Sequence, residues 1–488
     1  MRTIGRDFGD TARKVYAVAS GALGNGKTCV VNSDGTVSVV VETVVSQAVG
    51  SAATFESAHT KDVSVTFDSS NNKIVIVYRD QGNSQYGTAV VGTVSGTDIS
   101  FGTPVVFNSN SNTMETACTF DSNSNKVVVI YRDTSNNHNG LARVGTVSGT
   151  SISFGNEGTF QTGSSYINTD GITFDSNSNK VVVVWQFEGS GNKGKAAVGT
   201  VSGTSISFGT AATFNNASTS YPACTFDSNS NKVVVVYKDT ANSSHGTAII
   251  GTVSGTDISF GSEVVFEAAA TKVPTVAFDS TNNKVVIAYQ DDADSDKGKA
   301  IVGTVSGTSI SFGTAVTFSS DAVSATSTSF DSTAGKIVIA FDDGSGGVGS
   351  FISGAVSGTS ISFDTKGQVE SGDIEGTIGI AFDSNAGKTV IAYKSGSSSN
   401  YGKSNVITVG SVTRNLTSEN YIGITPSAYP DGAGAEIQTK GAVNEEQSGL
   451  TAGQSYFVQT DGTLSTTAGD PSVFAGTAVS ATKIIVKG

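Results

Sequence analysis

Cysteine and histidine are scarce in this chain, with three of each; tryptophan occurs once and proline six times. Cys29, Cys118 and Cys224 are the only cysteines in 488 residues, an odd number without clustered spacing. Such a count suggests neither a disulfide framework nor a zinc site. Cys118 and Cys224 occupy equivalent positions of an internal repeat, where other copies carry aliphatic residues or threonine. We expect both to be small buried hydrophobic residues rather than a pair.

Basic residues are outnumbered, with 29 lysines and arginines against 42 acidic residues and a net charge of −13. Nucleic-acid binding needs a basic stripe, so we predict no nucleic-acid partner. The sequence has no apolar run of about 18 residues, and hence no membrane insertion is expected. The first residues, 1–14, lack the apolar core of a signal peptide, so the sequence does not imply a secretory route.

What the chain does have is a repeat. Phe-Asp-Ser, followed six residues after the Phe by Lys, occurs seven times at spacings of 53, 54, 52, 52, 52 and 52 residues. Each copy continues into a β-branched run that ends on an aromatic residue. The motif phenylalanines are Phe67, Phe120, Phe174, Phe226, Phe278, Phe330 and Phe382. A period near fifty built from strand-like pieces is typical of β-propeller blades.

One copy, residues 221–266, predicts four antiparallel strands. Strand A (223–226) leads through a turn rich in Asp and Asn to strand B (232–237), which is apolar on both faces. Strand C (247–253) follows a polar loop. A Ser-Gly-Thr turn then leads to strand D, 257–266, which Gly261 interrupts. Four strands per copy is the propeller count, and turns this short argue against a parallel β-solenoid.

The ends of the array predict a closed ring. After Phe382, strands B (388–393) and C (404–412) are present, but the Ile-Ser-Phe strand of the six other copies is missing. A D-like piece occurs instead near the start of the chain, at 44–55. An N-terminal strand that completes the last blade would remove both sheet edges. We therefore predict an all-β fold: a seven-bladed β-propeller of four-stranded blades with small terminal β lobes.

Both ends of the chain leave the period. The domain prediction is an N-terminal β segment over 1–38, the propeller over 39–412, and a small C-terminal β domain over 413–488. Residues 449–465 read as a strand, an Asp-Gly hairpin turn and a second strand. The stretch 23–38 echoes it, so the two ends are expected to form β lobes beside the ring, as one lobe or two.

Comparison of the copies separates two faces of the predicted ring. The A–B and C–D turns barely change, and we call their side the repeated face; the B–C and D–A connections differ in every copy, and their side is the variable face. Variable loops on a rigid scaffold commonly carry binding specificity. The alternative is that the sequences of these loops vary by drift, without any role in binding. The candidate ligand-binding residues are Tyr86, His138, Tyr166, Phe187, Tyr221, His245 and Tyr401.

Cation sites are weakly indicated. Asp121, Asn123 and Asn125 resemble the first half of a calcium loop, but no closing glutamate follows, and Lys126 would oppose a cation. The acidic run 291–296 is the better calcium candidate, although such a run is usually a solvated loop. We predict no metal site and no cofactor.

Catalysis is not indicated either. Hydrolytic propellers such as sialidases converge carboxylates, arginines or a tyrosine on the central channel. Arg79, Arg132 and Arg143 are the only arginines among the blades, and Arg79 and Arg132 occupy one repeat position, shared with Lys238 and Lys394. A catalytic group should occur once. The sialidase box, a nucleophile elbow and a phosphate loop are all absent, so we predict no catalytic residues and no enzyme.

The terminal segments carry a resemblance. The runs 448–458, 462–465 and 475–483 resemble a module found in virion proteins of tailed phages, and 19–23 with 33–36 is similar to segments of the same kind of protein. The Val-Ser-Gly-Thr-Ser-Ile-Ser-Phe repeats also resemble those of phage fibre or appendage proteins. The resemblance implies a structural component exposed on a virion and supplies no family site residues.

The leading hypothesis is a non-enzymatic phage tail- or head-associated fibre or knob, made in the host cytoplasm and displayed on the particle. Its variable face would bind host-surface glycan or protein, and its terminal lobe would bind other virion structural proteins. Many copies on the particle, or a homo-oligomer, would add avidity. The alternatives are a capsid or tail decoration protein without a receptor and, less favoured, a glycan-cleaving propeller.

Overall fold

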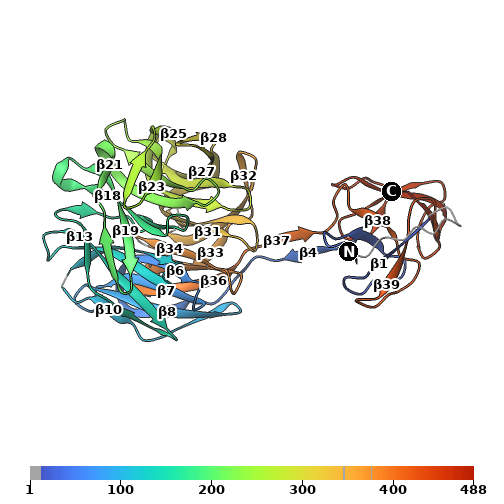
Figure 1. Cartoon of the computed structure of the whole chain (residues 1–488), viewed down its shortest axis with the longest axis horizontal. Helices are drawn as coiled ribbons and strands as arrows, with labels where there is room; N and C mark the ends of the chain where they lie inside the picture. The colour runs from blue at the N-terminus through green and yellow to red at the C-terminus, as the bar shows by residue number, and fades with distance from the viewer. Residues whose placement is uncertain (1–12, 111, 345–346, 375, 488) are drawn as a thin grey trace. The chain divides into compact units, whose positions relative to one another are not determined.

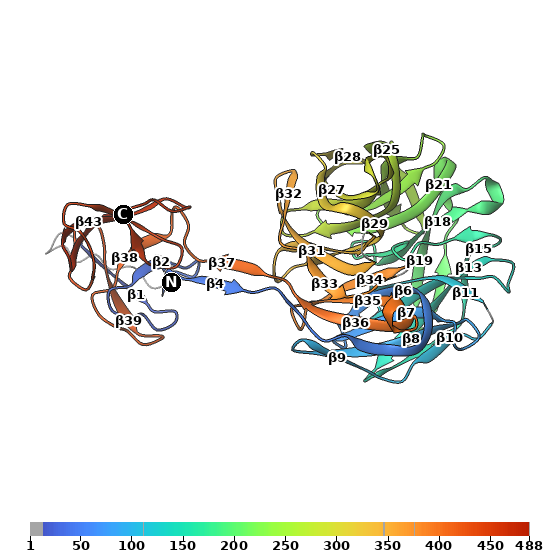
Figure 2. The same ribbon diagram turned by 180° about the vertical axis from the view of Figure 1, so that it is seen from behind.

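The computed structural model describes residues 13–110, 112–344, 347–374 and 376–487, which divide into two compact units. The ring unit is Ser46–Gly410, and the terminal unit consists of Met1–Val45 and Ser411–Gly488. Both are built from antiparallel strands (Figures 1 and 2). No helix in the described part of the chain is long and apolar enough to cross a membrane.

The described part of the ring unit contains seven four-stranded blades, one for each copy of the repeat, and in each the pairing runs A–B–C–D. Strands that continue from one blade into the next join several blades into larger sheets. The A strands are the ends of β6 (Ala53–Asp68), β21 (Ala212–Asp227), β25 (Val264–Asp279) and β29 (Val316–Asp331), together with β11 (Thr113–Asp121), β17 (Ile172–Asp175) and β34 (Ile378–Asp383). The B strands are β7 (Lys73–Asp80), β12 (Lys126–Asp133), β18 (Lys180–Phe187), β22 (Lys232–Asp239), β26 (Lys284–Asp291), β30 (Lys336–Asp343) and β35 (Lys388–Ser395). The C strands are β8 (Tyr86–Ser95), β13 (Asn139–Ser148), β19 (Lys193–Ser202), β23 (His245–Ser254), β27 (Lys297–Ser306), β31 (Val348–Ser357) and β36 (Tyr401–Thr408).

Strand D is broken into two pieces, as the interrupting glycine predicts. The first pieces are β9 (Asp98–Phe101), β14 (Ser151–Phe154), β20 (Ser205–Phe208), β24 (Asp257–Phe260), β28 (Ser309–Phe312), β32 (Ser360–Phe363) and β5 (Ala48–Val49). The second pieces are β10 (Val105–Asn108), β15 (Gly158–Gln161), β33 (Gly367–Glu370) and the starts of β6, β21, β25 and β29. Short 3-10 turns, η1 (Glu188–Ser190), η2 (Asp292–Asp294) and η3 (Gly396–Ser398), follow three of the B strands.

The N-terminal segment closes the ring, and this prediction is confirmed. β5 pairs with the end of β36, and the start of β6 pairs with its beginning, so the seventh sheet receives its D strand from the start of the chain. Each A strand contacts the next, from β6 around to β34 and back to β6. The fold is therefore a β-propeller, and the chain passes from blade to blade in sequence order.

The strand limits at the closure differ from the prediction. Strand C ends at Thr408 rather than at residue 412, and residues 44–45 do not belong to strand D. Instead, β4 (Glu42–Val45) pairs with β37 (Ser411–Arg414) as a two-stranded ribbon in the terminal unit. Both chain ends leave the ring at this place, and their backbone groups satisfy one another there.

The D–A connections also differ from the prediction. Four of them are not loops, because β6, β21, β25 and β29 each run unbroken through 16 residues from one blade into the next. A register shift lets each strand change partners, and in three of the four it coincides with a left-handed residue: Asp62 (φ 52), Tyr221 (φ 52) and Val273 (φ 41). Such a bulge turns the strand sharply enough to leave one sheet for the next.

The core lies between blades. The B-strand aromatic residues are completely buried, and six of them pack against a D-strand phenylalanine of the preceding blade, with ring centroids 5.0–5.2 Å apart. Each of these phenylalanine rings covers a glycine of strand C in its own blade; a Cβ on Gly246 would lie 2.4 Å from the Phe266 ring. In the sixth blade Val369 replaces the phenylalanine, and Phe351 of strand C supplies the ring. Cys118 and Cys224 are buried and free, as predicted.

The terminal unit contains two similar five-stranded antiparallel sheets; in each, two hairpins lie side by side, and the strand that comes first in sequence pairs with the strand that comes last. One contains β1 (Lys14–Val18), β2 (Thr28–Val31), β3 (Val37–Val39), β38 (Tyr421–Ile424) and β39 (Gly434–Gln438). The other contains β40 (Val443–Asn444), β41 (Ser455–Val458), β42 (Leu464–Ser465), β43 (Val473–Ser480) and β44 (Lys483–Val486). The carboxylate of Asp34 accepts hydrogen bonds from the amide and hydroxyl of Thr36 at 2.9 and 2.6 Å, and Asp461 does the same with Thr463. The echo between the two sequence ends is thus a repeated β-hairpin.

Candidate functional site

Three of the seven candidate residues occupy one repeated position. Tyr86, His245 and Tyr401 each begin a C strand, where they pair with the last residue of strand B in their own blade. All three side chains are half-buried. Tyr86 and Tyr401 lie on the first and seventh blades, which adjoin at the ring closure, whereas His245 lies apart from both on the fourth blade.

The other four candidates lie close together on the second to fourth blades. The carbonyl of His138 accepts a hydrogen bond from the amide of Ser165 at 3.2 Å. Ser165 begins β16 (Ser165–Tyr166), in which Ser165 pairs with Phe187 and Tyr166 with Gln186. Burial raises the pKa of the Tyr166 hydroxyl to about 12, and neighbouring Glu115 and Tyr221 contribute. His138 is exposed, whereas the three aromatic side chains are half-buried.

Arg132 holds this cluster in place. Its guanidinium lies 2.7 Å from Oε1 of Glu115 and 3.7 Å from Oε2 of Glu188, and it stands over the Tyr166 ring at 5.9 Å from the centroid. The arginine side chain is only 11% exposed, whereas that of Glu188 is 40% exposed. A planar guanidinium fixed by two carboxylates is a rigid support for the residues around it. We call Arg132, Glu188, His138, Tyr166 and Phe187, with adjacent Tyr221, the Arg132 cluster.

Glu115 connects the Arg132 cluster to two further segments: the connection to the third blade, through Ile167, and the first blade, through Asp62. It lies at a left-handed position of β11 (φ 55), and its carboxylate also accepts a hydrogen bond from the amide of Ile167 at 2.9 Å. Burial raises the pKa of Glu115, while Arg132 and the Ile167 amide act in the opposite direction by favouring the ionised form. The amide of Glu115 donates to Asp62 Oδ2 at 3.1 Å, and Asp62 in turn pairs with Arg79 at 3.0 Å.

Sequence reasoning missed this ionic network, although the repeats contain its signal. Asp62 and Glu115 occupy one repeat position, five residues before the motif phenylalanine, and Arg79 and Arg132 occupy another, directly after the strand B aromatic residue. The acidic residues occur only in the two copies that carry arginine; the copy with Lys238 has Tyr221 at that position. Paired changes at two repeat positions indicate contact between them.

The carboxylates of the acidic run 291–296 are paired with lysine side chains. Lys299 lies 2.6 Å from Asp291, Lys297 lies 2.9 Å from Asp294, and Lys272 pairs with both Asp292 and Asp296. The Lys272 ammonium holds the pKa of Asp292 below its usual range. Within the described residues no group of three or more His, Cys, Asp or Glu side chains is placed to hold a metal ion. The lysine ammonium groups neutralise the carboxylates that a calcium ion would use as ligands.

No protein-family model and no curated protein matches the chain. Among solved structures, it is similar to the BP39L lectin from Burkholderia pseudomallei, with 11% identity over 78% of this chain and 100% of that chain and a TM-score of 0.51. It is also similar to a protein of unknown function from Dyadobacter fermentans (10% identity, 77% and 99% coverage, TM-score 0.43) and to AofleA from Arthrobotrys oligospora (8%, 70% and 92%, TM-score 0.41). At this level of identity the likeness to the lectin shows the β-propeller fold alone.

Proposed function

We propose that the ring unit is a carbohydrate-binding propeller and that the Arg132 cluster is its principal contact surface. The observation that carries this proposal is the convergence of four of the seven predicted residues on one part of the variable face. Sugar rings are recognised by aromatic faces together with fixed hydrogen-bonding groups. The Arg132 cluster offers both: rings at Phe187 and Tyr221, and polar groups at Glu188 and His138.

Preorganisation favours this surface over the other variable loops. Buried Arg132 orients Glu188 and Tyr166 before any ligand arrives, so little side-chain entropy would be lost on binding. Each contact would be weak, and display of many copies would supply avidity. The solved structure with a TM-score of 0.51 is titled a lectin, which agrees with this class of ligand but does not identify it.

We further propose that the chain is exposed on a phage particle and attached through its terminal unit to other virion proteins. The resemblance of the terminal segments to a virion module supports this proposal. Mass spectrometry of purified particles, with electron microscopy of particles labelled by an antibody to the ring unit, would test it. Absence of the chain from purified particles would contradict it.

Glycan binding is tested with the full chain on a glycan array and on polysaccharide extracted from the host surface. Glu188→Gln and His138→Asn should weaken binding roughly tenfold, the effect of losing about 1.4 kcal/mol. Asn tolerates the left-handed backbone at His138 (φ 58), so the fold should persist. Ser244→Asn is the matched control, because Ser244 has the same repeat position and φ 62 in the fourth blade. Equal binding by all three variants would contradict the assignment to the Arg132 cluster, and no binding by wild type would contradict glycan recognition.

A further inference from the structure

The central channel of the ring is crossed by one short segment, residues 167–171. In this blade the D–A connection breaks into β15, β16 and β17 instead of one long strand. The carbonyl of Thr169 accepts a hydrogen bond from Ser64 Oγ at 3.3 Å, on the first blade, and the carbonyl of Asp170 accepts one from the amide of Cys224 at 2.9 Å, on the fourth. The segment is thereby tied to A strands on different sides of the channel.

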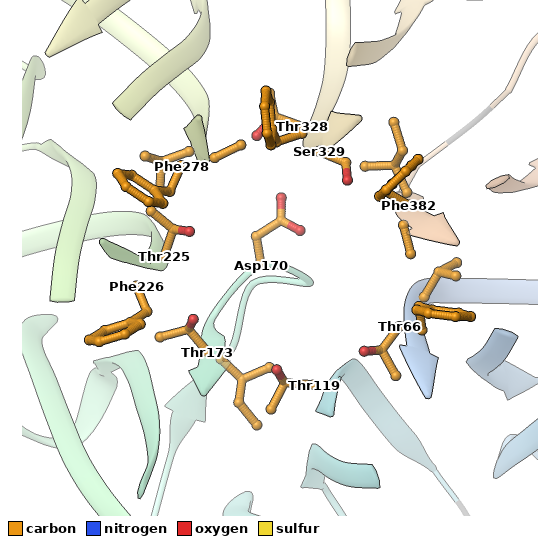
Figure 3. A pocket seen from close by; sticks show the side chains of 18 of the residues that line it. Thr66, Thr119, Asp170, Thr173, Thr225, Phe226, Phe278, Thr328, Ser329 and Phe382 are labelled. Carbon is orange, nitrogen blue, oxygen red and sulfur yellow. The ribbon is translucent and has the colours of Figure 1, made fainter. Parts of the chain in front are cut away.

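Above this segment the channel forms a pocket that reaches the repeated face. Its volume is about 540 Å³, and its lining extends from Thr169 and Asp170 to the A–B turn residues Ser280 and Ser384. Hydroxyl groups surround Asp170, and phenylalanines of the repeated motif stand around them (Figure 3). The lining hydroxyl residues are Ser64, Thr66, Thr119, Thr169, Thr173, Thr225, Ser280, Thr328, Ser329 and Ser384.

Asp170 is the sole charged residue of this lining, and it points into the middle of the ring of side chains (Figure 3). Its carboxylate has one described hydrogen-bonding partner, Ser327 Oγ, at 3.4 and 3.5 Å from the two oxygens. A single hydroxyl hydrogen can serve only one oxygen, and these distances are at the outer limit of a hydrogen bond. At least one carboxylate oxygen thus lacks a donor from the described residues.

Burial raises the pKa of Asp170 to about 7, and Ser327 opposes this shift. The other titratable groups that line the pocket are Cys118 and Cys224, and burial raises the pKa of both thiols, so they stay neutral near pH 7. A cation beside Asp170 would favour its ionised form and supply the missing partner.

We propose that this pocket binds a primary ammonium group carried by a small polar or alkyl molecule. A bare metal ion fits less well, because the pocket offers a single carboxylate and a volume within the range of small-molecule sites. The ammonium has three donors, which match the carboxylate and two hydroxyls of the ring. The phenylalanines that line the pocket offer aromatic surface suited to a cation or to its alkyl chain. The pocket opens on the repeated face, so its ligand would bind at a surface separate from the Arg132 cluster on the variable face.

The test uses the full chain with selectively labelled threonine methyl groups, observed by NMR at pH 7. At this pH both amines carry an ammonium group to a large extent, and a bound ammonium favours ionised Asp170. n-Butylamine and glucosamine are the probes, and n-butanol and N-acetylglucosamine are their uncharged counterparts. At least one amine should shift the resonances of Thr119, Thr173 and Thr225 with a millimolar Kd, while its uncharged counterpart binds at least tenfold more weakly. Binding of n-butylamine would indicate an alkylammonium ligand, and binding of glucosamine alone would indicate an amino sugar.

Variants decide whether Asp170 is responsible. Asp170→Asn keeps the shape of the side chain and should weaken amine binding at least tenfold, whereas Asp342→Asn, a buried carboxyl outside the pocket, should leave it unchanged. Ser327→Ala removes the competing hydroxyl and should retain binding, which separates loss of charge from disturbance of the crossing segment. The proposal is overturned if neither amine binds at 50 mM, if the uncharged counterparts bind as well, or if Asp170→Asn binds as wild type does.

Discussion

The seam of the ring, where the chain's beginning completes the last blade, should be its weakest point. Phe55 is 5% exposed, packs against Tyr78 at 5.2 Å, and covers Gly402 across the seam. Phe266 has the same environment in mid-ring, 5.2 Å from Tyr289 and over Gly246. The two residues are therefore a matched pair for substitution by alanine.

Each substitution should cost about 3–5 kcal/mol, the usual range for a buried phenylalanine reduced to alanine. The two substitutions should, however, destabilise different parts of the ring. Strand D around Phe266 follows strand C directly through a short turn, whereas the strand of Phe55 is joined to β36 only by pairing. Loss of Phe55 can thus be relieved by local separation at the seam, which the covalent turn hinders at Phe266.

Hydrogen exchange followed by mass spectrometry measures this difference. In Phe55→Ala, amides of β36 and β5 should lose roughly a hundredfold or more in protection, as about 3 kcal/mol implies, while the middle blades stay protected. In Phe266→Ala we expect no selective loss of amide protection in β36 and β5. Equal exchange patterns in the two variants, or unchanged protection of β36 in Phe55→Ala, would refute the reasoning.

Three further predictions follow from other contacts. Burial raises the pKa of Asp342 from 3.8 to about 6, so its contribution to stability falls as the pH rises from about 4 to about 6 and stays at that lowered level above pH 6, while its ionisation has no effect below about pH 4. Asp342→Asn should accordingly raise the free energy of unfolding by up to ~3 kcal/mol at pH 7.5 and not at pH 4, and urea titrations giving equal shifts at both pH values would contradict this. Gly402→Ala, whose Cβ would lie 2.3 Å from the Phe55 ring, should cost about 1–3 kcal/mol by the same assay, and a neutral effect would show that the ring can move. The double variant Lys272→Ala, Lys299→Ala should create weak calcium affinity in the loop 291–296, detectable by calorimetry, and calcium binding by the wild type instead would contradict the pairing seen here.

The blades could be predicted because every copy repeats the same pattern of strands and turns. Alternation around the motif, the Asp-rich turn and the missing last D strand are local signals, and they are sufficient for strand order and ring closure. The path of residues 42–45 could not be predicted, because their apolar residues suit strand D as well as the ribbon with β37. Pairing with residues 411–414 depends on where both chain ends leave the ring, which no local pattern records.

Only part of the candidate site could be predicted from the sequence. Aromatic residues and histidines on the variable face could be selected, but their grouping depends on which blades adjoin and on strands that run unbroken through the expected D–A loops. The segment 167–171 was the least predictable element. Its spacing of 54 residues marks an insertion, yet its hydrogen bonds to Ser64 and Cys224 are with blades distant in sequence. The Asp62–Arg79 and Glu115–Arg132 pairs, by contrast, leave a signal in the repeats that the sequence-based prediction missed.

The ring unit is a domain inserted into the terminal unit at the ribbon of β4 and β37. We call the ring unit the guest domain and the terminal unit its host. The chain leaves the terminal unit at Val45 and returns at Ser411, so the whole ring unit occupies the position of a hairpin loop. Synthesis must then finish the guest before the host can assemble, since most of the host's strands come last. Inserted domains tolerate replacement when their two ends lie close together. Another ring, with other loops, could be grafted at this stem while the β-hairpins of the host stay as they are.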